Sequence, residues 1–223
     1  MIIGALNGWN IIGTPDSPGI RQVQWDLTDL IGEVGSPYSG TAQQQDWMTD
    51  FWQGTMTLPQ MSADHAGQWR GFLAELRGKL NVFPLSDPYG LSPTGAANGQ
   101  PACNDWIRVQ TGSGYRMEQV NLPRCRVLYT RGWQPSIQAQ LKVGDYLQIG
   151  KRLHMVIAQD VDSDDQGNAT ISIWPSIREA PNDGAPIILN NPTGLFRLKS
   201  NKRSWTVGPN RLFSVSYEIK EAL

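Results

Sequence analysis

The chain has 223 residues, of which 39% are hydrophobic and 17% are charged, and its formal net charge is -1. This near balance of charge excludes bulk electrostatic attraction to a nucleic-acid backbone or an anionic membrane as the main mode of binding. Every apolar run is shorter than the about 18 residues of a membrane-spanning helix, and the N-terminal segment lacks the basic residues of a signal peptide. We therefore expect no nucleic-acid binding and no membrane insertion.

The first half of the chain begins with a predicted strand and a predicted loop. Residues 22–27 alternate, with Val23, Trp25 and Leu27 on one face, which predicts a half-buried strand. Residues 32–49 are polar and rich in Gly and Gln, so we predict a long exposed loop there.

A predicted strand, helix and strand follow over residues 51–88. Alternation over residues 51–58 predicts a strand that Pro59 ends. Apolar residues then recur at spacings of three and four, which is typical of one buried helical stripe: Ala66, Trp69, Phe72, Leu73, Leu76 and Leu80. A second strand is predicted over residues 81–85. We expect the core of this block to contain Trp52, Met56, Leu58, Trp69, Phe72, Leu73 and Leu76.

The two ends of the predicted helix carry ordinary helix signals. Ser62 or Asp64 can cap its start, because a short side-chain oxygen accepts from the free amides of the first turn. Arg77 supplies a cation at its end, and Gly78 supplies a residue that readily adopts the left-handed conformation.

Residues 84–102 are dense in Pro, Gly and Asn and indicate a domain boundary, after which the predicted secondary structure changes. Short strands predominate from residue 106 to residue 189, as in a small barrel or sandwich. The final strand, over residues 213–219, alternates like the N-terminal strands. We therefore predict a mainly β protein. One domain is built from both ends of the chain, residues 1–103 and 192–223, and a small β domain is inserted at residues 104–191.

An acidic cluster formed by Asp160, Asp162 and Asp164 is the strongest metal candidate. Asp at positions one, three and five is how an EF-hand loop begins, but position six is Asp165 instead of Gly and position twelve is Ile171 instead of Glu. We expect a solvated hairpin tip there and no metal site.

Nucleophilic chemistry has few candidate residues. The two histidines are His65 and His154, and the two cysteines are Cys103 and Cys125, so either cysteine with His154 is the candidate pair. The cysteines are interpreted as thiols in a reducing cytosol, with a single bridge between them as the alternative. The sequence has no phosphate-binding, dinucleotide-binding or zinc-protease motif. We expect no catalytic residues, no cofactor and no enzyme.

The tryptophans divide into two groups. Trp25 and Trp52 occupy alternating strand positions and are interpreted as core. Trp133 and Trp174 lie in the predicted inserted domain near several arginines, and we keep a stacking role for them as an alternative. In that alternative the domain binds carbohydrate on a host surface.

Several segments of the sequence resemble tail proteins of tailed bacteriophages. The closest resemblance is to the distal tail protein type. These segments are WQGTMTLPQM, QWRGFLAELRGKLNVFPLSDP, PTGAANGQP, LKVGDYLQIGKRLHMV, DVDSDDQGNATISIWPSIREAPNDGAPI, GLFRLKSN and SVSYEIKEAL. The resemblance extends over nearly the whole chain.

The resemblance implies a structural virion protein with a tail-tube-like fold and no catalytic residues. That fold is a β-sandwich with one flanking helix. Such proteins form hexameric rings between the tail tube and the tip or baseplate hub, and many carry a second β domain, so the resemblance implies a small galectin-like or OB-like β-barrel at residues 104–191. The implied partners are further copies of the chain, the tail tube protein and the hub protein, and a host-surface glycan is the partner in the carbohydrate-binding alternative. The implied location is the virion tail after synthesis in the host cytoplasm. Residues 32–49 would correspond to the extended hairpin with which tube folds reach a neighbour. Another tail-tube or tail-tip component is the alternative.

Overall fold

The computed structural model describes residues 1–35, 38, 40–98, 108–109, 124–208 and 211–222. Within these residues the chain has one helix, α1, and strands β1 to β14, so the prediction of a mainly β fold with one helix is confirmed. The chain divides into two compact units. The first unit contains Met1–Leu27, Phe51–Leu85 and Gly194–Leu223, and the second contains Thr28–Asp50 and Ser86–Thr193. The predicted boundaries, 1–103 with 192–223 against 104–191, differ from this division because Thr28–Asp50 and residues 86–98 belong to the second unit.

The first unit is built on a six-stranded sheet, in which five strands follow the order β3-β4-β14-β12-β5 and the sixth, β13, pairs with β14. Their bounds are Gln22–Gly35 for β3, Ala42–Thr57 for β4, Phe213–Glu221 for β14, Gly194–Leu198 for β12 and Phe83–Leu85 for β5. The C-terminal strand β14 pairs antiparallel with β4, from Ser216 opposite Thr57 to Lys220 opposite Gln53. The sheet thus joins the two ends of the chain, as the alternation of the last strand predicted.

Three short strands complete the first unit. The hairpin of β1 (Ile2–Leu6) and β2 (Trp9–Ile12) meets the segment before β5 through a parallel bridge between Ile11 and Val82. Strand β13 (Trp205–Val207) pairs antiparallel with the beginning of β14, and all three of its residues are exposed.

Helix α1 spans Ala63–Glu75 and packs its predicted stripe on the sheet. The Trp69 ring centroid lies 6.3 Å from that of Tyr217 on β14, and the Phe72 ring meets Phe83 of β5 edge-on at 5.4 Å. All seven residues predicted for this core are at most 4% exposed: Trp52, Met56, Leu58, Trp69, Phe72, Leu73 and Leu76. Aromatic side chains of this size supply much of the apolar area that a small unit buries.

Both ends of α1 differ in detail from the prediction. The helix ends at Glu75, and Arg77 and Gly78 both have positive φ, so Leu80 leaves the stripe and is 45% exposed. Its placement on the buried stripe was wrong, because two consecutive left-handed residues turn the chain away from the helix axis. Ser62 is the N-cap residue, but its side chain caps no amide and lies instead 3.3 Å from His65 Nδ1.

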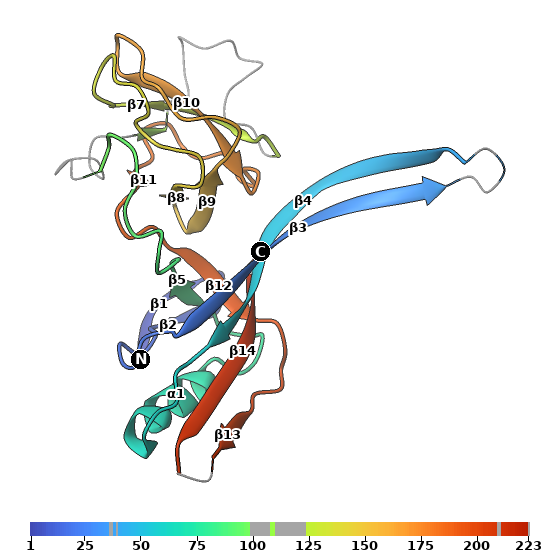
Figure 1. The fold of residues 1–223 in the computed structure, drawn as a ribbon, viewed down its shortest axis with the longest axis vertical. Coiled ribbons are helices and arrows are strands. Elements are labelled where there is room, and N and C mark those ends of the chain that lie inside the picture. Colours follow the sequence, from blue (N-terminus) through green and yellow to red (C-terminus); the bar gives the residue numbers. More distant parts are fainter. Residues whose placement is uncertain (36–37, 39, 99–107, 110–123, 209–210, 223) are drawn as a thin grey trace. The chain divides into compact units, whose positions relative to one another are not determined.

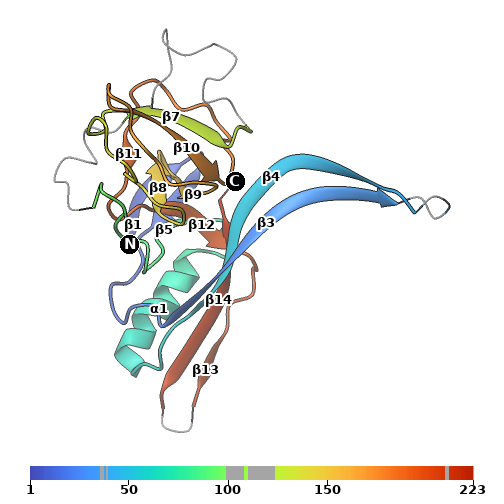
Figure 2. The same cartoon turned by 45° about the horizontal axis from the view of Figure 1, so that its top comes forward.

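The predicted loop over residues 32–49 was wrong as well. Strand β3 continues to Gly35 and β4 begins at Ala42, so most of this segment is a two-stranded ribbon. Figures 1 and 2 show β3 and β4 side by side from both viewpoints. The polar composition reflects exposure of the ribbon to solvent, because cross-strand pairing satisfies backbone groups whatever the side chains are.

The second unit contains an antiparallel sheet in the order β11-β8-β9-β10-β7-β6. The strands are β6 (Arg108–Val109), β7 (Val127–Arg131), β8 (Tyr146–Ile149), β9 (Arg152–Val156), β10 (Asn168–Trp174) and β11 (Ile187–Ile188). They are short, as the turn-rich sequence predicted. Their inward side chains form one hydrophobic cluster, in which Leu128, Leu147 and Ile171 are fully buried.

Candidate functional site

The outer part of the β3–β4 ribbon is the most unusual surface of the chain. We call residues 28–35 of β3 and 42–50 of β4 the arm. Four of its large apolar side chains are exposed, by 40% at Leu30, 58% at Ile31, 74% at Val34 and 56% at Trp47. Several exposed large apolar side chains on one short ribbon indicate a contact surface.

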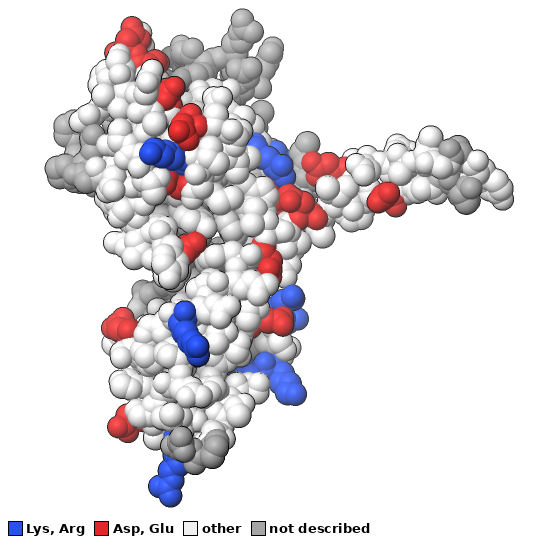
Figure 3. Space-filling model, in the orientation of Figure 1, with Lys and Arg blue, Asp and Glu red and all other residues white. Residues whose placement is uncertain are grey.

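The arm is also acidic throughout. Its charged residues are Asp29, Glu33, Asp46 and Asp50, and no Lys or Arg occurs anywhere from residue 22 to residue 69. On the face shown in Figure 3, the ribbon beyond its base carries acidic atoms and no basic ones. A partner for this surface therefore needs both apolar groups and positive charge.

The base of the arm is held within the second unit by a buried carboxylate. Asp50 is 1% exposed and accepts hydrogen bonds from the backbone amide of Ser176 at 2.9 Å and from Arg126 Nε at 3.2 Å. Arg178 Nη2 donates to the carbonyl of Asp50. Across the ribbon, Asp29 pairs with Arg126 Nη2 at 2.9 Å. These bonds satisfy a charge that would be costly to bury alone, and they give the arm a defined base.

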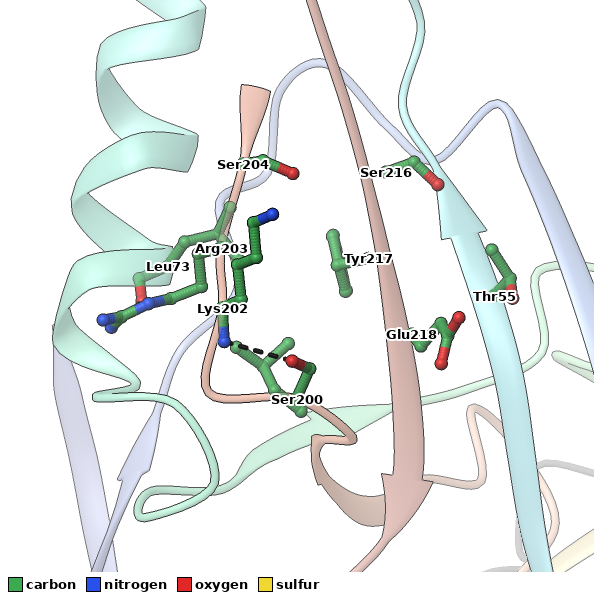
Figure 4. A pocket seen from close by; sticks show the side chains of 10 residues that line it. Thr55, Leu73, Ser200, Lys202, Arg203, Ser204, Ser216, Tyr217 and Glu218 are labelled. Carbon is green, nitrogen blue, oxygen red and sulfur yellow. Dashed lines mark hydrogen bonds between the residues drawn. The ribbon is translucent and has the colours of Figure 1, made fainter. Parts of the chain in front are cut away.

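A groove of about 460 Å³ lies in the first unit, between the 200–204 segment and β14 (Figure 4). Figure 4 shows Lys202 beside the groove and the Arg203 guanidinium turned toward α1. Arg203 Nη1 donates to the carbonyl of Leu73 at 3.2 Å. It thus supplies a cation near the C-terminal end of α1, whose own last turn contains no basic residue. The remaining polar lining consists of the carboxylate of Glu218 and the hydroxyl groups of Thr55, Ser200, Ser204 and Ser216.

A second hollow, of about 630 Å³, adjoins the first and shares Leu73 and Arg203 with it. It lies between α1 and β13 and is lined by Gly67, Arg70, Gly71 and Trp205 among others. The Arg70 guanidinium lies over Trp205, 5.7 Å from the ring centroid. We call the two hollows together the basic groove, because Arg70, Lys202 and Arg203 line it.

Tyr217 of β14 lies at the floor of the basic groove and belongs to the aromatic core. Burial raises the pKa of its hydroxyl well above the ordinary range. Within the described residues that hydroxyl has no hydrogen-bond partner. Tyr217 therefore contributes a largely buried aromatic side chain to the lining of the groove.

The three candidate metal ligands accept hydrogen bonds from backbone amides in three different segments. Asp160 accepts from the amide of Val143 at 3.0 Å, and Asp162 accepts from the amide of Ala139 at 2.7 Å. Asp164 accepts from the amide of Asn168 at 2.7 Å, and hydrogen bonds from Asn168 lower the pKa of its carboxyl. No group of three metal-ligating side chains occurs in the described part of the chain.

The two candidate stacking residues are both buried. Trp133 is 5% exposed and donates through Nε1 to Thr130 Oγ1 at 2.7 Å. Trp174 is 4% exposed and donates to Asp29 Oδ1 at 3.2 Å. Neither indole offers an open ring face for a sugar, and Trp174 instead helps to hold the base of the arm.

The candidate nucleophilic pair is not brought together by the described residues. His154 is buried with Nδ1 2.8 Å from the carbonyl of Pro175, and burial lowers its pKa to about 4. Cys125 is a half-buried free thiol that accepts from the amide of Val127 at 3.4 Å. Cys103 lies outside the described residues.

No protein-family model matches the chain, and no curated protein sequence matches it. None of the described helices has the length and apolar character needed to cross a membrane. Sequence reasoning missed the arm as a structural element. The signal available in the sequence was two apolar pairs, Leu30 with Ile31 and Trp47 with Met48, separated by a segment rich in Gly and Ser.

Proposed function

We propose that this chain is a structural subunit that assembles head to tail into a ring at the distal end of a phage tail, between the tail tube and the tip or baseplate hub. The observation that carries the proposal is the arm. It exposes Leu30, Ile31, Val34 and Trp47 on a ribbon whose outer residues are open to solvent on both faces. The resemblance to distal tail proteins supplies the setting.

The physical argument concerns what a solitary ribbon requires. A two-stranded hairpin is marginally stable in water by itself, and its open edges invite pairing with other chains. The eight residues 28–35 extend roughly 25 Å at about 3.3 Å per residue, which is long enough to reach across an adjoining subunit. A neighbour that covers the arm provides the packing that the ribbon lacks within its own chain.

An arm on one surface that binds a different surface of the next copy makes a heterologous interface. Such an interface closes into a ring when the rotation between subunits divides a full turn, and otherwise continues as a filament. Sixfold closure matches the symmetry expected of a tail tube. The competing role in carbohydrate binding loses the two stacking residues proposed for it, because Trp133 and Trp174 are buried.

Native mass measurement and negative-stain electron microscopy of the purified protein test this proposal. We expect closed rings of the full chain. The matched variant replaces residues 31–48 with an Asn-Gly turn, which retains Asp29 and Asp50 at the base and shortens the arm. We expect that variant to fold and to remain monomeric. The proposal is wrong if the full chain stays monomeric at high concentration and never binds tails, or if the shortened variant forms the same rings.

A further inference from the structure

We infer that the arm of one copy docks into the basic groove of the next copy, with arm carboxylates meeting Lys202 and Arg203 and arm apolar side chains meeting Trp205. This inference rests on the proposed ring and names the two surfaces that form its repeating contact. It concerns contacts between copies of the chain.

Charge complementarity is the first argument. Residues 22–69 contain six acidic residues and no basic residue, whereas residues 194–217 contain five basic residues and no acidic residue. Two segments of opposite sign within one chain of net charge -1 favour association between copies. Glu33 and Asp46 lie in the outer part of the arm, beyond the ion pairs at its base.

The accessibility of the groove is the second argument. Lys202 and Arg203 are exposed, and within the described part of the chain the Lys202 ammonium has no ion-pair partner. The carboxylate nearest in sequence, Glu218, is occupied by Lys199 at 3.5 Å. The groove is therefore lined by three basic side chains, Arg70, Lys202 and Arg203, and by one carboxylate, Glu218, which is paired with Lys199.

The shape of the groove is the third argument. Gly67 and Gly71 lie along its α1 side, and a Cβ atom placed at either would have no other heavy atom within 4 Å. Two side-chain-free positions on a helix allow the backbone of a docked strand to come close. On the opposite side, Trp205 is 48% exposed and Val207 is 53% exposed, so an apolar rim faces any incoming segment.

The same features account for the arm's composition. An interface centre usually combines aromatic anchors with a rim of complementary charge. Trp47 and Val34 provide the apolar part on the arm, and Glu33 and Asp46 provide the charge.

A charge-reversal cycle tests the pairing. The groove variant is Lys202→Glu with Arg203→Glu, and the arm variant is Glu33→Lys with Asp46→Lys. We expect each to weaken assembly at least tenfold, because it places like charges in contact. The variant that carries all four changes restores opposite charges and should assemble again. Lys151→Glu, an exposed lysine of the second unit, is the matched control and should assemble like the parent chain.

Analytical ultracentrifugation over a range of concentrations reads out assembly, and circular dichroism confirms that each variant is folded. Lys202→Glu alone serves if the Arg203 change unfolds the first unit. Normal assembly of a folded groove variant, alongside a monomeric shortened-arm variant, would overturn the inference while leaving the ring intact. Failure of the fourfold variant to recover would also overturn the inference. A parent chain that never assembles would overturn the ring and the inference together.

Discussion

Trp47 of β4 lies across Gly32 of β3, so that a Cβ atom at position 32 would be 3.0 Å from the Trp47 Cζ2 atom. The glycine leaves room for the indole to rest on the ribbon while 56% of the side chain remains exposed. An aromatic ring held in this way is already ordered before it meets a partner, which reduces the entropy lost on binding.

The first prediction concerns this pair. Gly32→Ala should displace the Trp47 ring and weaken ring assembly by about 1 kcal/mol, because an added methyl group forces a packed neighbour to move. Native mass spectrometry over a dilution series measures the change. The control is Gly35→Ala, where an added Cβ meets no other heavy atom within 4 Å. Equal assembly of the two variants would show that the position of Trp47 does not matter.

The second prediction concerns the buried carboxylate at the base of the arm. Asp50→Asn should lower the free energy of unfolding of the second unit by about 3 kcal/mol, because it removes the buried negative charge that binds Arg126 and accepts hydrogen bonds from Ser176. Urea unfolding measures the loss. Asp183→Asn breaks an exposed pair with Arg131 and should cost less than about 1 kcal/mol. A loss at Asp50 no larger than that at Asp183 would contradict the role assigned to burial.

The third prediction concerns pH. Burial lowers the pKa of His154 to about 4, so the folded chain keeps it neutral at pH values where the unfolded chain protonates it. The associated stability is complete above about pH 6.5 and is lost as the pH falls toward 4, by about 3 kcal/mol in total. The difference in unfolding free energy between the parent chain and His154→Gln, followed across this interval, isolates the contribution. A difference that does not vary with pH would be incompatible with a buried neutral imidazole.

The fourth prediction concerns the end of α1. Phe72→Ala should destabilise the first unit by about 3–5 kcal/mol, because Phe72 is 4% exposed within the aromatic core. Leu80→Ala should cost less than about 1 kcal/mol, since Leu80 lies beyond the helix and is 45% exposed. Thermal unfolding of the two variants provides the comparison. Similar losses would mean that the helical stripe extends to residue 80 after all.

Local periodicity was sufficient to predict the helix and the strands whose buried residues recur at regular spacing. The spacing of Ala66, Trp69, Phe72 and Leu73 predicted α1 and its buried face, and the alternation at the C-terminus predicted β14. Both patterns arise within a few turns or residues of the backbone, so no distant contact is needed to recognise them. The short strands of the second unit followed from the density of turn residues.

The arm could not be predicted in this way. A ribbon exposed on both faces has no buried side to impose alternation, so its sequence resembles that of a loop. Pairing of residues in β3 with residues in β4 decides between the two, and that pairing is a non-local property of the backbone. The same limitation applied to the ends of α1, where the conformation of Arg77 moved Leu80 off the stripe.

At the candidate site, the sequence determined the types of residue and the tertiary structure determined their exposure and proximity. The order of residues along the chain alone shows an acidic segment and a basic segment. It also shows that few residues are candidates for catalysis or metal binding. Only the tertiary structure decided that Trp133 and Trp174 are buried, that Asp160, Asp162 and Asp164 bind separate backbone amides, and that Arg203 and Arg70 line one groove. Exposure and proximity depend on which segments fold against each other, and residues far apart in the chain carry no local record of that choice.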